Sequence, residues 1–137
     1  MVAAMVKEIE GHYGPQIASV TPSATPADFT APGGCFVALY DGDRPVAGGG
    51  VKRLTDDVGE IKRMYVVPDR RGTGLGRKML NVLEEAARGL GYKRVRLDTG
   101  RLQPEAEQLY RSAGYEQIGN YNANDYASFW GEKALFP

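Results

Sequence analysis

The sequence has 137 residues, with 17 basic and 17 acidic side chains and a formal net charge of zero. This length fits a single domain spanning residues 1–137, and a balanced charge argues against a nucleic-acid partner, which a basic excess normally attracts. One cysteine and one histidine exclude an internal disulfide and supply no metal-ligand set, and no apolar run approaches the ~20 residues of a membrane span, so we expect no metal, no membrane and a cytoplasmic setting.

The first 34 residues give weak patterns. Val2, Met5, Val6 and Ile9 recur at three- and four-residue steps, which predicts a short amphipathic helix at the start. Residues 16–34 are rich in Thr, Ser, Pro and Ala and fit either a substrate loop or a plain connector, with one helical turn at residues 25–28. No strand is evident before Cys35.

Three strands in series are predicted next. The apolar run at residues 35–40 ends at the hairpin turn Asp41-Gly42-Asp43, and residues 46–54 form the returning strand. After a turn at residues 55–59, residues 60–67 form a third strand that Pro68 terminates. Consecutive antiparallel strands of this kind make a meander.

Helices and strands alternate in the second half. A helix follows the third strand, with one apolar face made by Met79, Leu83, Ala86 and Leu90. Residues 94–98 alternate as a strand, residues 103–113 form a second helix, and residues 115–119 and 126–133 form closing strands. The predicted fold class is α/β (α+β), with a mixed, mostly antiparallel central sheet flanked by helices.

A glycine-rich loop joins the third strand to the first helix and contains Gly72, Gly74 and Gly76. Unbonded amides at a helix N-terminus bind phosphate, and Arg71, Arg77 and Lys78 add positive charge there. The dinucleotide fingerprint does not fit, because its third glycine would fall at Arg77, and no Gly-Lys-Ser/Thr of a P-loop occurs. The alternative is a turn that only caps the helix.

The R-x-x-G-x-G pattern of Arg71, Gly74 and Gly76, after a strand that ends V-x-P, resembles the coenzyme A loop of the GNAT superfamily of N-acetyltransferases. Residues 97–106 and 109–115 (LYRSAGY) look like the superfamily's second motif, and residues 128–135 (SFWGEKAL) are similar to its closing strand. Together these motifs cover residues 36–135 in order. The start departs from the family, whose members usually begin with a strand and a long helix that help build the acceptor pocket. Either this chain has a shortened N-terminal region, or its opening residues do something different.

The resemblance implies where acetyl-CoA binds as co-substrate. Amides from Arg71 to Arg77 would hold its pyrophosphate, and a strand bulge would free the Val66 amide to polarise the thioester carbonyl. Gln103 stands where many relatives have an asparagine that bonds the pantetheine. The complete set of cofactor-binding residues expected from the family is Met64, Tyr65, Val66, Arg71, Gly72, Thr73, Gly74, Leu75, Gly76, Arg77, Gln103 and Tyr110.

Two residues are the candidate catalytic groups. Helical spacing alone makes Tyr110 a core residue, whereas the resemblance implies that it protonates the departing thiolate of CoA. Glu60 matches the offset of the catalytic glutamate in the histone-acetyltransferase branch, and its alternative is a solvated strand-end charge beside Lys62. Asp98 and Glu105 are the other candidate bases. We assign no catalytic role to His12, read as a surface residue, or to Cys35, read as a small buried apolar group.

The function implied is transfer of an acetyl group from acetyl-CoA to a primary amine of a small molecule or peptide by direct attack. A non-catalytic CoA-binding sensor is the first alternative. An acyltransferase for another acyl-CoA or a hydroxyl acceptor is the second, since the glycines at 48–50 could leave room for a bulkier group. A homodimer is also considered.

Overall fold

The computed structural model describes residues 4–8, 29, 32–100 and 104–136. The expectations for His12, for the helical turn at residues 25–28 and for Gln103 fall outside these residues. Of residues 4–8 it describes the backbone.

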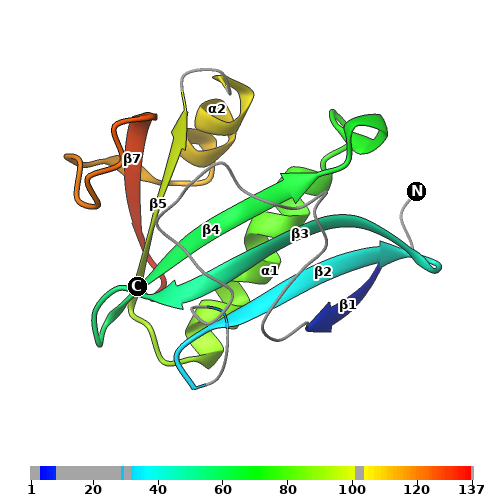
Figure 1. Cartoon of the computed structure of the whole chain (residues 1–137), viewed down its shortest axis with the longest axis horizontal. Coiled ribbons are helices and arrows are strands. Elements are labelled where there is room, and N and C mark those ends of the chain that lie inside the picture. The colour runs from blue at the N-terminus through cyan, green and yellow to red at the C-terminus, as the bar shows by residue number, and fades with distance from the viewer. Residues whose placement is uncertain (1–3, 9–28, 30–31, 101–103, 137) are drawn as a thin grey trace.

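The described strands form one mixed sheet in the order β1-β2-β3-β4-β5-β7-β6 (Figure 1). The strands are β1 Ala4–Glu8, β2 Cys35–Asp41, β3 Arg44–Arg53, β4 Val58–Val66, β5 Arg94–Gly100, β6 Glu116–Gln117 and β7 Ala127–Ala134. The helices are the short 3-10 helix η3 Pro68–Arg70, α1 Leu75–Gly89 and α2 Pro104–Ser112. Among the strand pairs that the structure describes, only β4–β5 is parallel, which confirms the predicted fold class.

The start of the chain differs from the expectation. Residues 4–8 are the edge strand β1, antiparallel to β2 from Ala4 opposite Asp41 to Glu8 opposite Val37. The predicted helix is therefore wrong, and so is the absence of a first strand. Over so few residues apolar spacing does not separate helix from strand, and the free edge of β2 supplies backbone partners that no local pattern reveals.

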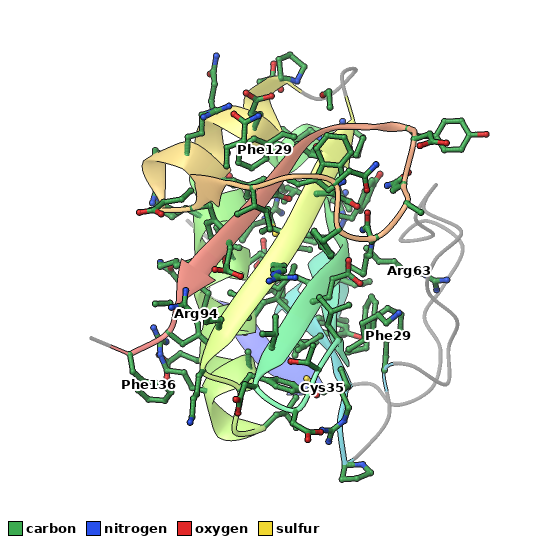
Figure 2. The ribbon with its side chains drawn as sticks, turned by 90° about the vertical axis from the view of Figure 1, so that its left-hand side faces the viewer. Phe29, Cys35, Arg63, Arg94, Phe129 and Phe136 are labelled. Carbon is green, nitrogen blue, oxygen red and sulfur yellow. The ribbon has the colours of Figure 1, made fainter. Side chains whose placement is uncertain are left out.

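The main core lies between the sheet and the two α-helices, which cover the same face; α1 lies behind the sheet in Figure 1. Its largest fully buried members include Leu39, Met79, Leu80, Leu83, Tyr92, Leu97 and Phe129. On the opposite face Phe29 packs edge-on against Phe36, with ring centroids 5.7 Å apart, and Arg63 lies over the Phe29 ring (Figure 2).

At two of the three consecutive glycines in β3, neighbouring side chains occupy the space that a Cβ would need. A Cβ on Gly49 would lie 2.7 Å from Leu83, and one on Gly50 would lie 2.4 Å from the Phe29 ring. Gly49 and Gly50 therefore accommodate Leu83 of α1 and the Phe29 ring, and neither of these two positions leaves room for a bulkier acyl group.

The β4 strand is irregular where it leaves β5. Parallel pairing joins residues 58–60 to 94–96 and stops at Glu60 opposite Arg96, after which the two strands diverge (Figure 1). On the other side, Gly49 opposes both Arg63 and Met64 in a β-bulge, where Arg63 has φ +57°. The divergence and the bulge place the end of β4 apart from β5.

Candidate functional site

The end of β4 directs a backbone amide away from the sheet ladder. Val66 pairs with Ala47, and the Val67 N–H donates to the Val46 carbonyl at 3.0 Å. This bond makes Val66 and Ala47 a non-hydrogen-bonded pair, so both polar groups of Val66 face away from β3, toward the side from which β5 has diverged. The Val66 carbonyl there accepts a bond from Arg71 Nε at 2.9 Å. The N–H that the family resemblance singles out thus points into the divergence.

The glycine-rich loop exposes the start of α1. Gly72 and Gly74 have φ of +76° and +86°, and Gly74 is the N-cap of the helix without a side-chain capping bond. The first-turn amides of this 15-residue helix are therefore left without side-chain caps and carry the positive end of its dipole. A Cβ on Gly76 would lie 3.4 Å from Leu109, so α2 packs close to this end.

Cationic side chains of the loop are held by the protein in different ways. Arg71 lies over the Tyr65 ring at 5.3 Å, and Arg77 donates to the Ser112 hydroxyl. Arg44 donates two hydrogen bonds, of 2.8 and 2.9 Å, to the neighbouring Asp69 carboxylate. These bonds lower the pKa of Asp69 below its ordinary value. Uncapped amides beside Arg71 and Arg77 make this end of α1 suited to a phosphate group.

Tyr110 lies in the core, as helical spacing predicts. Its residue surface is 6% exposed, and its ring is 6.0 Å from that of Tyr115. No hydrogen bond between described residues involves its hydroxyl. Burial, and secondarily the negative charge of Asp98, raise its pKa above the ordinary value, so the hydroxyl stays protonated at neutral pH.

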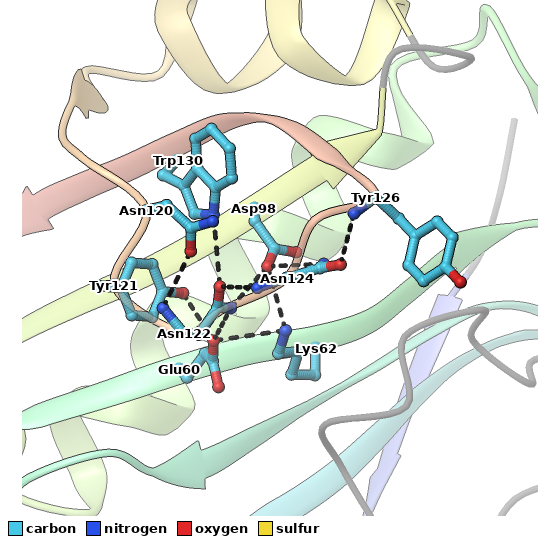
Figure 3. A network of polar contacts seen from close by, with 9 residues as sticks. All are labelled: Glu60, Lys62, Asp98, Asn120, Tyr121, Asn122, Asn124, Tyr126 and Trp130. Carbon is cyan, nitrogen blue, oxygen red and sulfur yellow. Dashed lines mark hydrogen bonds and ion pairs between the residues drawn. The ribbon is translucent and has the colours of Figure 1, made fainter.

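Glu60 is buried rather than solvated. Its side chain is 2% exposed, and its Oε2 lies 3.3 Å from Lys62 Nζ. The same oxygen accepts bonds from the Tyr121 hydroxyl at 2.6 Å and from Asn122 Nδ2 at 3.0 Å (Figure 3). The reading of Glu60 as a solvated strand-end charge is therefore wrong. Its carboxylate belongs to a buried network at the last residue of β4 that pairs with β5.

Asp98, a second candidate base, belongs to the same network. Its Oδ2 lies 3.2 Å from Lys62 Nζ and accepts bonds from Asn122 at 2.6 Å and Asn124 at 3.1 Å. One lysine thus pairs with two carboxylates on the face opposite the α-helices. The third candidate, Glu105, lies exposed in the first turn of α2 and is not part of this network.

A match to the family model described as "Acetyltransferase (GNAT) family" spans residues 4–115. The chain is 32% identical over 130 residues to the uncharacterized N-acetyltransferase YjgM of Escherichia coli, covering 85% of this chain and 75% of that protein. The chain belongs to the GNAT acetyltransferase family. This confirms the resemblance and the enzyme class, that of acyltransferases.

Solved structures agree with the GNAT fold. A candidate acyl-CoA N-acyltransferase from Klebsiella pneumoniae superposes with a TM-score of 0.80 at 25% identity, over 98% of this chain and 99% of that one. An aminoglycoside 6'-N-acetyltransferase complexed with coenzyme A has a TM-score of 0.68 at 20% identity, over 82% and 78% of the two chains. Neither described α-helix has the length and apolar character to cross a bilayer.

Sequence reasoning missed the polar loop of this GNAT chain at residues 118–126. Tyr121, Asn122 and Asn124 contact the carboxylates, and Trp130 Nε1 donates to Asn122 Oδ1 at 3.3 Å. The alternating asparagines Asn120, Asn122 and Asn124 were the available signal, but asparagine between two strands first indicates a turn. Their contacts depend on β4 and β5, which are distant in sequence.

Proposed function

We propose that residues 1–137 form one N-acetyltransferase domain that moves an acetyl group from acetyl-CoA to a primary amine of a small molecule or peptide in the cytoplasm. The amine attacks the thioester directly. Membership of the GNAT family supports a CoA-based donor, and the choices of acetyl group and amine rest on the residues of the site.

The Val66 amide is the observation that carries this proposal. Its N–H faces the divergence of β4 and β5 and belongs to a residue whose carbonyl is held by Arg71. An amide already aimed at the place where negative charge develops on a carbonyl oxygen needs little reorganisation during reaction. A thioester bound there would supply the activated acetyl group. Amides of residues 71–77 would hold its pyrophosphate, with Met64 and Tyr65 beside the pantetheine.

Proton transfers are assigned to side chains of the chain itself. Glu60 takes a proton from the acceptor ammonium, directly or through water. Its Oε2 lies in an ion pair with Lys62 and accepts hydrogen bonds from Tyr121 and Asn122, which fix the position of the carboxylate. Tyr110 holds its proton until the sulfur leaves, because burial keeps its hydroxyl protonated. Neither role needs a metal ion.

The test is release of free CoA from acetyl-CoA in the presence of polyamines, aminoglycosides, amino acids, peptide N-termini and lysine peptides, each measured separately. We expect turnover with at least one amine, and a roughly 10²–10⁴-fold lower kcat for Glu60→Gln with little change in acetyl-CoA affinity, the range typical of general bases.

Three other results would point elsewhere. Tight binding of acetyl-CoA without turnover with any acceptor would support the sensor alternative. Turnover with a longer acyl-CoA but not with acetyl-CoA would identify the longer acyl-CoA as the donor. Normal turnover and an unchanged pH profile in Glu60→Gln would exclude Glu60 as the base.

A further inference from the structure

The loop at residues 118–126 is organised by its own asparagines. The Asn122 N–H donates to Asn120 Oδ1 at 3.3 Å, and the Asn124 N–H donates to Asn122 Oδ1 at 3.2 Å. The Tyr126 N–H repeats the pattern on Asn124 Oδ1 at 3.1 Å. Because each side-chain oxygen binds the backbone two residues on, the amide nitrogens of Asn122 and Asn124 are left to donate elsewhere.

Asn122 connects the two carboxylates across the divergence of β4 and β5. Its Nδ2 donates to Glu60 Oε2 at 3.0 Å and to Asp98 Oδ2 at 2.6 Å, while its Oδ1 accepts from Trp130 (Figure 3). Two acceptors on one side and two N–H donors on the other allow a single amide orientation. The backbone ladder between the strands ends at Glu60, so this side chain bridges them where the ladder no longer does.

The remaining donors are divided between the two carboxylates. Tyr121 bonds to Glu60, Asn124 bonds to Asp98, and Lys62 pairs with both. The charged and titratable groups around the pair are Lys62 on β4, Arg96 on β5, Glu132 on β7 bonded to Arg96, Tyr121 on the loop below Arg96, and Tyr110 on α2. Asn122 is thus the described neutral side chain that bonds to both carboxylates.

We propose that Asn122 is a positioning residue for acyl transfer, which holds the Glu60 and Asp98 side chains together and fixes where Glu60 accepts the acceptor's proton. This inference rests on the proposed function. A hydrogen bond to a carboxylate favours its charged form, so removing the donor lets the base bind a proton and lose activity at a pH where it would otherwise work. The effect falls on proton transfer and leaves the loop that holds the CoA thioester unchanged.

The decisive comparison is Asn122→Asp against Asn120→Asp. Asn122→Asp removes the donor to both carboxylates and places a third negative charge beside them, and both changes favour the protonated form of Glu60. Asn120→Asp adds a charge to the same loop away from the pair, and aspartate at 120 still accepts the bond that Asn120 accepts. We expect the acidic limb of the kcat/KM profile to move up by roughly one pH unit in Asn122→Asp, with the KM for acetyl-CoA unchanged. Asn120→Asp, at an exposed position, keeps the original profile.

Tyr121→Phe provides a second, milder variant that keeps the ring below Arg96, adds no charge and removes one donor from Glu60 alone. It should move the same limb in the same direction by a smaller amount, whereas Asn124→Ser, which removes a donor from Asp98 alone, should move it less. Equal profiles for the two aspartate variants, or a pH-independent loss of kcat with a lowered Tm, would overturn the positioning role.

Carboxyl ¹³C NMR titration of Glu60 and Asp98 makes the same comparison without turnover. Asn122→Asp should raise both titration midpoints, and unmoved midpoints would refute the inference. A protein that shows these shifts but releases no CoA with any amine would contradict the proposed function instead. The two failures are therefore distinguishable.

Discussion

Tyr110 is a core residue and also the proposed proton donor. The ring belongs to the core between the sheet and the helices, and its hydroxyl belongs to no hydrogen bond among the described residues. Tyr110→Phe keeps the ring and removes only the oxygen. If the phenol protonates the departing thiolate, the loss appears as the bond to sulfur breaks, and therefore in kcat.

We expect Tyr110→Phe to lower kcat by roughly 10²-fold, to leave acetyl-CoA affinity within a few-fold and to change the free energy of unfolding by at most about 1 kcal/mol. Stopped-time CoA release, calorimetric binding and thermal melts measure the three quantities. A variant that melts early yet turns over normally once folded would make Tyr110 a core residue alone, with solvent as the proton source.

At the scale of elements, sequence patterns predicted what depends on local periodicity. The meander, α1, β5 and α2 appear within a few residues of their expected bounds, because alternation and helical spacing extend over many residues there. β1 and the environment of Glu60 were not predictable in this way. β1 needs the edge of β2, and Glu60 is buried by a loop some 60 residues later in the chain.

Gly74 lies at the junction between the loop and α1, and its substitution tests whether the loop binds acetyl-CoA. At φ +86° it has no heavy atom within 4 Å of the place that a Cβ would occupy, so an alanine would meet no clash, only an unfavourable left-handed backbone. That conformation costs about 1–2 kcal/mol for a residue with a Cβ, and relaxing it would turn the first-turn amides. We expect Gly74→Ala to weaken acetyl-CoA binding at least tenfold.

Gly89→Ala is the matched control for this change. It lies at the other end of the same helix, also with open space around the added carbon and without a positive φ. Its affinity for acetyl-CoA should equal that of the unmodified protein, and its stability should rise slightly, by up to ~1 kcal/mol. Equal affinities for the two alanine variants in calorimetry would remove the loop from the pyrophosphate site.

At the scale of the molecule, the described residues include a buried carboxylate on each face of the sheet that accepts a hydrogen bond from a tyrosine. On the helix face, Tyr115 donates to Glu84 at 2.9 Å, and Lys133 lies 3.0 Å from the same carboxylate. On the other face, Tyr121 donates to Glu60. The two networks join α1 to β7 and the loop at residues 118–126 to β4, so they connect segments that the backbone ladder does not.

These networks predict a loss of stability at high pH. Burial first, and the neighbouring carboxylate second, raise the pKa values of Tyr115 and Tyr121 above their ordinary value. The unfolded chain releases these protons near pH 10 while the folded protein keeps them, so the unfolded state binds fewer protons and the free energy of unfolding falls as pH rises. The stabilisation is complete below about pH 10 and is lost above it, at about 1.4 kcal/mol per pH unit for each tyrosine.

Urea unfolding of the unmodified protein and of Tyr115→Phe between pH 8 and 11 measures this contribution. At pH 8 the variant should be less stable, because Glu84 has lost a donor in a buried site. Above pH 10 the difference between the two proteins should shrink by about 1.4 kcal/mol per pH unit, since phenylalanine releases no proton in either state. A difference that stays constant from pH 8 to 11 would show that Tyr115 has the same pKa in the folded and unfolded chains. That result would contradict the burial of its hydroxyl in the folded protein.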